Sequence, residues 1–293
     1  MNFGDAIALV RPRQWTKNLA VVAPLVFAGR LLDLRALELS LFAFVAFCFV
    51  SSAVYSINDV VDAERDRQHP VKQDRPVAAG RMSSAQALLL AAVLLGAGLS
   101  IGLLVDAHCA IALCAYFALQ LLYIFALKNL LIVDMIVVAI GFVVRAITGA
   151  MAINVSVSPW FVLCTGLLAL FLAIAKRRHE IVLLHEHSDS HRPVLSEYSA
   201  ELLDSYMVTL SASTITAYAL YTFTTARTQY YWMMMSIPFV IFGILRYQYL
   251  VLRKGRGGRP EEILLSDTPL MVDIVLWTVY IIVVRYVIHR YVS

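Results

Sequence analysis

The sequence has very little charge. Only 15% of its 293 residues are Asp, Glu, Lys or Arg, whereas 60% are hydrophobic and the mean hydropathy is +0.76. A soluble domain does not need so much apolar surface, and several apolar runs are long enough to cross a bilayer. The composition therefore excludes an ordinary soluble protein and indicates a polytopic membrane protein.

Cysteine is also scarce, and it shows no metal-ligand spacing. All four cysteines lie in apolar runs, where reduced cysteine behaves as a small hydrophobic residue: Cys48, Cys109, Cys114 and Cys164. The basic N-terminal stretch is not followed by a short apolar core with a small-residue cleavage site. We therefore expect no cleaved signal peptide.

The apolar runs predict nine membrane-spanning helices in a single all-α domain. Their expected ranges are 17–33, 39–57, 85–105, 108–127, 131–151, 158–175, 206–226, 231–251 and 270–291. The first range is the weakest, because it contains Pro24 and is barely long enough. The chain shows no convincing internal repeat, in contrast to many transporters.

The basic residues decide the expected orientation of these spans. If the N-terminus is cytoplasmic, seventeen Lys and Arg residues fall in cytoplasmic segments and two fall within spans. The five on the other side are Arg30, Arg35, Arg227, Arg285 and Arg290. The expected topology has a cytoplasmic N-terminus and an external C-terminus. The net charge of +4 then reflects membrane orientation, and we expect no nucleic-acid partner.

One polar stretch, residues 58–81, follows the second expected span. On a helix Asn58, Asp59, Asp62 and Asp66 fall within about 100° of one another, and the first and last are ~12 Å apart along the axis. Carboxylates stacked in this way repel one another unless a cation neutralises them. Oxygen ligands of this kind suit Mg²⁺.

Basic residues lie among and after these carboxylates: Arg65, Arg67, Lys72, Arg75 and Arg81. Acidic residues for a metal beside basic residues for phosphate are the pattern expected of a diphosphate site. The alternative is a solvated loop whose charges balance, but such a loop has no reason to place four metal-type ligands on one helical face.

A second group of charges begins where the sixth expected span leaves the membrane. Lys176 and Glu180 are four residues apart and share a helical face, and Arg177 lies between them. The two basic residues would suit phosphate. Simple anchoring at the membrane surface is the alternative, although it explains poorly why an acid lies among the bases.

Two further cations are candidate ligands. Arg145 lies eleven residues after Asp134, on the same helical face and roughly 20 Å from the start of its span. A charge at this depth is costly unless it faces a polar cavity, so Arg145 is either a structural buried ion or a phosphate ligand. Lys128 lies at a helix end, where it either complements the helix dipole or binds phosphate.

Two loops carry weaker signals. Residues 185–192 contain three histidines, for which we favour a solvated loop over a zinc site because their spacing is mixed. The glycine-rich loop at 255–260 is expected to be flexible and able to close over a site.

The run Asn58-Asp59-x-x-Asp62-x-x-x-Asp66 after an apolar helix resembles the aspartate motif of the UbiA superfamily of intramembrane prenyltransferases. Further stretches make the chain similar to the branch that transfers phosphoribose to a polyprenyl phosphate. These stretches are 11–18, 53–59, 69–80, 141–147, 175–180, 196–198 and 260–267. The resemblance therefore covers nearly the whole chain.

This resemblance implies a UbiA-like bundle in a bacterial inner membrane, with its active site at the cytoplasmic face. It implies Mg²⁺-dependent transfer of 5-phosphoribose from 5-phosphoribosyl 1-diphosphate (PRPP) to a decaprenyl-type polyprenyl phosphate, with release of diphosphate, to make pentose donors for the cell envelope. Mn²⁺ is a possible substitute for Mg²⁺, and a homo-oligomer is possible. The resemblance leaves the lipid chain length and the oligomeric state open.

The resemblance also assigns roles to residues. Asp59, Asp62 and Asp66 would be catalytic and, with Asn58, would hold the metal. Substrate contacts would come from Lys17, Arg75, Lys128, Arg145, Lys176, Arg177, Glu180 and Tyr198. The acceptor phosphate is already anionic, so no general base is expected.

One departure from the wider superfamily is informative. Prenyl-diphosphate users carry a second Asp-x-x-x-Asp motif, whereas this chain has Lys176-x-x-x-Glu180 at the corresponding place. A base in place of an acid suits a donor with a further phosphate. Two alternatives remain: prenylation of an aromatic acceptor, and a transporter of lipids or small molecules.

Overall fold

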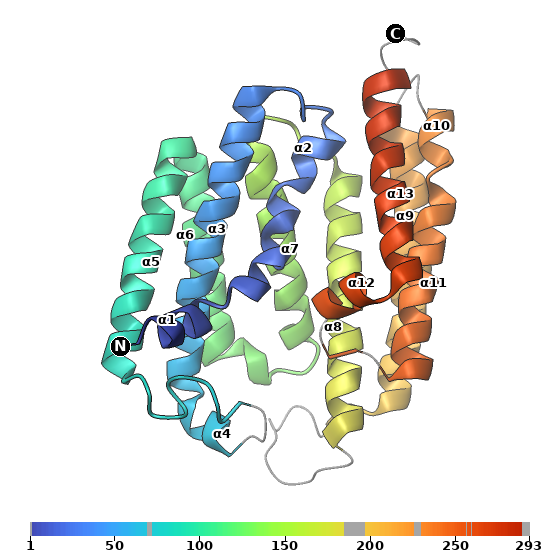
Figure 1. Cartoon of the computed structure of the whole chain (residues 1–293). Coiled ribbons are helices and arrows are strands. Elements are labelled where there is room, and N and C mark those ends of the chain that lie inside the picture. Colours follow the sequence, from blue (N-terminus) through green and yellow to red (C-terminus); the bar gives the residue numbers. More distant parts are fainter. Residues whose placement is uncertain are drawn as a thin grey trace.

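The computed structural model describes residues 2–68, 72–184, 197–225, 230–255, 257–258 and 260–288. Within these ranges every regular element is a helix, and the long helices stand side by side in one bundle (Figure 1). The elements are α1 (Phe3–Val10), η1 (Pro12–Val21), α2 (Ala23–Phe27), α3 (Leu34–Val61), α4 (Ala63–Arg67), α5 (Ser84–Val105), α6 (Ala107–Phe125), η2 (Leu127–Asn129), α7 (Val133–Ala152), α8 (Pro159–Leu184), α9 (Ala200–Thr225), α10 (Tyr230–Met234), α11 (Ile237–Lys254), α12 (Pro260–Ser266), α13 (Thr268–Val283) and η4 (Val284–Ile288). The all-α prediction is confirmed.

Seven helical segments of the described chain are long and apolar enough to cross a membrane. They are Leu34–Val61, Ser84–Val105, Ala107–Phe125, Val133–Ala152, Pro159–Val182, Tyr231–Lys254 and Thr268–Tyr286. Each coincides with one of the nine expected spans. The chain is therefore a multi-pass membrane protein.

The first expected span, 17–33, does not form one helix, so that part of the prediction is wrong. The segment is divided between the 3₁₀ helix η1 and the five-residue α2. Pro24 has no backbone N–H to continue a helix from η1, and it lies in the first turn of α2, where proline is tolerated. The 3₁₀ geometry stretches the chain, so the ten residues of η1 cover about 20 Å.

Helix α9, which covers residues 206–225 of the expected span 206–226, is 26 residues long but less apolar than the seven segments. Much of its polarity comes from serine and threonine. Ser205, Thr209 and Ser213 each donate a hydrogen bond to the carbonyl four residues earlier in the same helix. These hydroxyls are satisfied by their own backbone, so they do not prevent α9 from lying among apolar neighbours.

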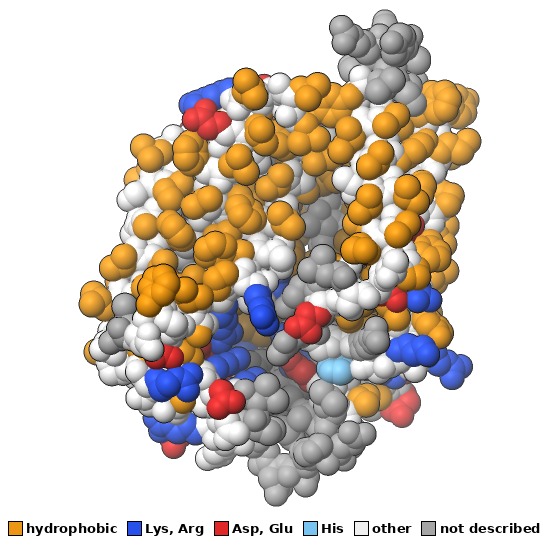
Figure 2. Space-filling model, viewed as in Figure 1, with side chains coloured by type: hydrophobic (Ala, Val, Ile, Leu, Met, Phe, Trp, Pro, Cys, Tyr) orange, Lys and Arg blue, Asp and Glu red, His pale blue; other side chains and the backbone are white. Residues whose placement is uncertain are grey.

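The surface of the bundle is apolar while its interior contains charges. Leu104, Leu89 and Ile111 are 79%, 67% and 66% exposed, whereas Asp134 and Arg145 are buried. In Figure 2 hydrophobic side chains cover the upper and middle parts of the visible face, and charged side chains gather toward its lower end. This arrangement is the one expected where lipid replaces water around the protein.

The two largest of the five apolar clusters among the described residues hold the bundle together. One joins α3, α6, α7 and η1 through Phe47, Val50 and Leu113, and the other joins α8, α9, α11 and α13 through residues such as Phe171 and Met207. Helix α7 packs against both α6 and α8, so it connects the two cores. It thereby brings charged residues from both halves of the chain to one end of the bundle.

Candidate active site

The aspartate motif lies at the end of α3, where the helix bends. Asp62 has φ −92° and ψ 2° and separates α3 from the short α4. Two backbone hydrogen bonds nevertheless keep the helical register across the bend, from Asp62 N–H to the Asn58 carbonyl (2.9 Å) and from Asp66 N–H to the Asp62 carbonyl (2.8 Å). Asp59, Asp62 and Asp66 are consequently all buried, and Asn58 is half-buried.

Each of these carboxylates is held by a basic residue from another segment. Arg75 bridges Asp59 and Asp66, with its Nη1 3.1 Å and 2.6 Å from their carboxylate oxygens. The ammonium of Lys128, buried on η2, lies 2.7 Å from Asp62. Arg75 and Lys128, both predicted from the sequence, thus meet the aspartates.

Arg11 also forms an ion pair with Asp59, although it was not among the site residues predicted from the sequence. It adopts a left-handed conformation with φ 55°, which is unusual for a residue with a side chain. The chain around it is anchored on α3, because Trp15 Nε1 donates to Ser52 Oγ (3.0 Å) and that hydroxyl donates to the Val10 carbonyl (2.8 Å). In the sequence, Arg11 is marked by its position directly before Pro12.

The carboxylate oxygens of Asp59, Asp62 and Asp66 are ligands of the type that a hard divalent cation such as Mg²⁺ prefers. Oδ2 of Asp59 is buried and has no hydrogen-bond partner, an arrangement that costs free energy unless a cation or another donor satisfies it. In the part of the chain that the structure describes, no three His, Cys, Asp or Glu side chains form a ready metal-binding group. The carboxylates are paired with arginine and lysine instead. Substrate phosphate and water would have to complete a Mg²⁺ coordination shell, which is how Mg²⁺ is commonly bound.

A second network brings together three other predicted residues. Asp134, fully buried in the first turn of α7, forms an ion pair with Arg177 and accepts a hydrogen bond from the Tyr198 hydroxyl (3.1 Å). Arg177 also bonds Glu180 at 2.7 Å. Burial raises the pKa of Tyr198 to about 12, so its hydroxyl keeps its proton near neutral pH and remains a donor. Asp134 therefore joins Arg177 to Tyr198, a role that the sequence did not indicate.

Tyr198 also secures a strained turn at the start of α7. The Ile132 backbone has φ 67°, an outlier for a β-branched residue, and its N–H donates to the Tyr198 hydroxyl at 2.6 Å. The segment before α9 is thereby tied to the start of α7.

Lys176 is exposed at the same end of α8, next to the buried Arg177. The glycine-rich loop lies against this part of α8. A Cβ on Gly257 would lie 2.7 Å from Cβ of His179, and one on Gly258 would lie 2.6 Å from its ring. The absence of a side chain therefore lets the loop approach the helix near Lys176. The three-histidine segment at 185–192 lies outside the described residues.

Arg145 and Lys17 lie further into the bundle than the aspartate motif. Arg145 donates to Asn18 Oδ1 (2.8 Å), to the Gly141 carbonyl (2.9 Å) and to the Tyr116 hydroxyl (2.6 Å), and its guanidinium also lies over aromatic rings. Asn18 in turn donates to Ser51, two helical turns or about 10 Å before Asn58 on α3. These neutral contacts favour the structural role for Arg145. Lys17 is half-buried on η1, one residue before Asn18.

Comparison with known proteins identifies the family. Residues 19–264 match the model of the UbiA prenyltransferase family. The chain belongs to that family. The resemblance inferred from the aspartate motif is therefore confirmed.

Two curated relatives are similar over almost their whole length. The decaprenyl-phosphate phosphoribosyltransferase of Mycolicibacterium smegmatis is 37% identical, covering 92% of this chain and 89% of that protein. The protein of the same name from Corynebacterium glutamicum is 37% identical, covering 98% and 88%. Both belong to the branch expected from the stretches outside the aspartate motif.

A solved UbiA homologue has the same fold. The structure from Archaeoglobus fulgidus bound to GPP and Mg²⁺ superposes with a TM-score of 0.74 and covers 97% of this chain and all of its own. Its sequence is only 18% identical, so the similarity establishes the fold alone. The UbiA-like bundle that the resemblance implied is thereby confirmed.

Proposed function

We propose that this protein transfers 5-phosphoribose from PRPP to a decaprenyl-type polyprenyl phosphate and releases diphosphate, as the names of its curated relatives indicate for those proteins. The observation that carries the proposal is the pairing of three buried aspartates with Arg11, Arg75 and Lys128. A site built in this way contains cations for phosphate and carboxylates for a metal, both at one end of a membrane-embedded bundle.

The reaction exchanges one bond at the anomeric carbon of the ribose. An oxygen of the acceptor phosphate forms a bond to this carbon, while the bond to the diphosphate oxygen breaks and its electron pair leaves with the diphosphate. The acceptor oxygen is already anionic, so no proton has to be removed and no side chain has to act as a general base. The task left for the protein is to hold two anions next to each other.

Arg11, Arg75 and Lys128 perform this task by exchanging partners. When the diphosphate enters, the guanidinium and ammonium groups exchange their carboxylate partners for phosphate oxygens. Arginine forms bidentate hydrogen bonds with phosphate. Asp59, Asp62 and Asp66 would be the residues that hold Mg²⁺, with Asn58 as an additional oxygen ligand. The bound Mg²⁺, or Mn²⁺ in its place, would neutralise the charge that develops on the leaving diphosphate.

We assign Lys176 to the 5-phosphate of the donor. It is exposed at the same end of the bundle, at the position where prenyl-diphosphate users carry an acid. Arg177 has a different role in this scheme, because Asp134 and Glu180 already neutralise it and fix it between α7 and α8. We assign Arg177 and Tyr198 to positioning the end of α8 that presents Lys176.

The proposal includes a location. We infer that α9 is an eighth span, because its 26 residues extend about 39 Å. We infer a ninth crossing by the η1–α2 segment, as a broken passage and not as the single helix expected over 17–33. The N-terminus and the aspartate site face the cytoplasm of a bacterial inner membrane and the C-terminus lies outside. The water-soluble donor then reaches the site from the cytosol, while the lipid tail stays in the bilayer.

The test uses purified full-length protein in detergent, with labelled PRPP and decaprenyl phosphate, followed by extraction of the lipid. We expect label in the lipid fraction, none with excess chelator, and recovery with Mg²⁺ or Mn²⁺. Asp62→Asn should lower kcat by at least a hundredfold, roughly the effect of losing a metal ligand at the reacting group. Glu64→Gln is the matched control, because this acid of α4 is 83% exposed and pairs with Arg67.

A parallel reaction offers geranyl diphosphate and an aromatic acid instead. Prenylation of the aromatic acid in this reaction, with no labelled lipid in the first, would overturn the proposal in favour of aromatic prenyl transfer.

A further inference from the structure

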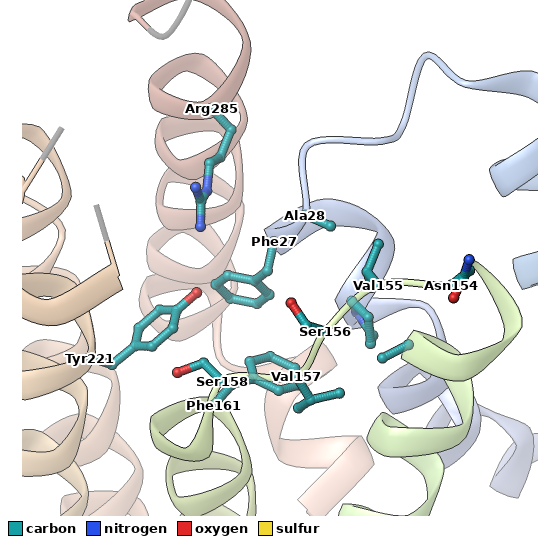
Figure 3. A pocket seen from close by; sticks show the side chains of 12 residues that line it. Phe27, Ala28, Asn154, Val155, Ser156, Val157, Ser158, Phe161, Tyr221 and Arg285 are labelled. Carbon is teal, nitrogen blue, oxygen red and sulfur yellow. The ribbon is translucent and has the colours of Figure 1, made fainter. Parts of the chain in front are cut away.

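The end of the bundle opposite the aspartate site contains a cavity of about 450 Å³ (Figure 3). It lies where α2, the end of α7, the 154–158 loop, the start of α8, α9 and η4 come together. Pro159 begins α8 beside the cavity, and Lys176 is seventeen residues further along the same helix, a distance of about 26 Å. The cavity is therefore separate from the candidate active site.

The cavity contains a cation and no acidic side chain among its described lining residues. Figure 3 shows Arg285 reaching down from η4 toward Phe27, and the Tyr221 hydroxyl pointing into the same space. The guanidinium lies beside the Tyr221 hydroxyl, and its Nε is buried and has no hydrogen-bond partner. A buried guanidinium N–H without an acceptor costs free energy, and an anion would satisfy it.

The start of α8 adds to the positive potential of the cavity. Ser158 and Phe161 line it, and Ser158 directly precedes the 26-residue α8. The N-terminal end of a long helix carries partial positive charge. In α8 this contribution comes from the helix dipole, because Pro159 has no N–H and the Phe161 N–H already bonds the Ser158 carbonyl (3.0 Å). The helix end and Arg285 therefore both favour a negatively charged ligand.

We propose that this cavity binds the phosphate of an anionic lipid headgroup in the leaflet opposite the active site. The cavity lies at one end of a bundle with an apolar outer surface, the level at which lipid phosphates lie. Phe27 and Phe161 contribute apolar area beside the cation, which suits a headgroup joined to its glycerol.

The test titrates delipidated full-length protein in neutral detergent with phosphatidylglycerol, with diacylglycerol and with sodium phosphate. Bound lipid is counted by native mass spectrometry, and the thermal midpoint is followed in parallel. We expect phosphatidylglycerol to bind and to raise the midpoint, and diacylglycerol to do neither. Arg285→Gln should weaken lipid binding by roughly tenfold or more, since one charge-assisted contact is lost.

Arg35→Gln is the matched control, because Arg35 lies at the same end of the bundle, is exposed and pairs only with Glu38 in the described contacts. It should leave lipid binding unchanged. Ala28→Leu is a second variant: it keeps Arg285 but places apolar atoms in the exposed mouth of the cavity, and it should also weaken lipid binding. The phosphoribosyl-transfer activity of each variant is measured as well. Unchanged activity shows that the aspartate end of the bundle is intact.

Equal lipid binding by the wild type, Arg285→Gln and Ala28→Leu would overturn the proposal. An equal loss in Arg35→Gln would also overturn it, because the binding would then reflect surface charge alone. Sodium phosphate that saturates the cavity as tightly as phosphatidylglycerol would reject the lipid and identify a free anion as the ligand.

Discussion

Lys176 and Arg177 are neighbours in the sequence, but the structure gives them different surroundings. Arg177 is buried between two carboxylates, so its charge is already neutralised and its geometry is set by Asp134. Lys176 is exposed at the same end of α8. Charge alone cannot distinguish a phosphate ligand from a structural cation, whereas burial can. We therefore expect the two residues to behave differently when they are substituted.

Lys176→Ala should raise the KM for PRPP by roughly ten- to a hundredfold, the effect of losing one charge-assisted contact to phosphate. The KM for the lipid and the thermal midpoint should stay unchanged. Lys176→Asp should be worse, because it sets a carboxylate against the donor phosphate. Separate titrations of each substrate with purified variants measure these effects.

Arg177→Ala is the matched comparison. It leaves Asp134 buried without its main partner, which costs roughly 3–5 kcal/mol for a broken buried ion pair, so the thermal midpoint and the yield of folded protein should fall. A raised lipid KM with an unchanged donor KM in Lys176→Ala would contradict the assignment and move Lys176 to the acceptor side of the site.

At the scale of the elements, the position of η1 depends on its close approach to α7. A Cβ on Gly149 would lie 1.8 Å from the carbonyl oxygen of Val21, a contact that no relaxation of a side chain can relieve. Nearby, Arg145 on α7 bonds Asn18 on η1. Because η1 also carries Lys17, the packing of these two elements determines where a candidate phosphate ligand lies.

Gly149→Ala should separate η1 from α7 and lower stability by at least ~1–3 kcal/mol, the usual cost of overpacking. Gly96→Ala is the control, since Gly96 lies in the helix α5 with no atom within 4 Å of the added Cβ. Alanine there should be neutral or should stabilise the helix by up to about 1 kcal/mol. Thermal unfolding in detergent compares the two, and equal midpoints would show that η1 and α7 do not touch as described.

At the scale of the whole molecule, the two ends of the bundle have different chemistry. The aspartate end combines acids with bases from the α1–η1 junction, η2, the 72–82 loop and α8, whereas the other end holds the cavity around Arg285. The distribution of Lys and Arg predicts that the aspartate end is cytoplasmic. The proposed water-soluble donor would need the same orientation in order to reach the site from the cytosol.

Cysteine labelling in intact cells tests this orientation. A cysteine replacing Gln73 or Lys254 should be protected from an impermeant thiol reagent, and one replacing Ser156 should react, because all three positions are exposed on the structure. The unsubstituted protein is the control, because it reports any labelling of the four native cysteines. Labelling at Gln73 and Lys254 but not at Ser156 would reverse the topology and place the site on the side without the donor.

Several features follow from the sequence because their causes are local. Membrane-spanning helices depend on the summed hydropathy of about twenty consecutive residues, so seven of the nine expected ranges appear as long apolar helices. The aspartate motif depends on the helical repeat, which places Asp59, Asp62 and Asp66 near one another through short-range hydrogen bonds. The interruption at Pro24 was also visible, although its result, a 3₁₀ helix before a short α2, was not.

The partners of these residues were decided only by the tertiary structure. Arg11 and Asp59 are forty-eight residues apart, and Arg177 and Asp134 are forty-three apart. By charge alone, any nearby base suits any of the acids, so sequence reasoning had no means of choosing Arg11 or Asp134. The choice depends on which helix ends the two apolar cores bring together, and on a backbone contact at Gly149 that no charge or hydropathy pattern encodes. The cavity around Arg285 has the same origin, because its walls come from segments between residues 24 and 285 that meet only when the bundle is packed.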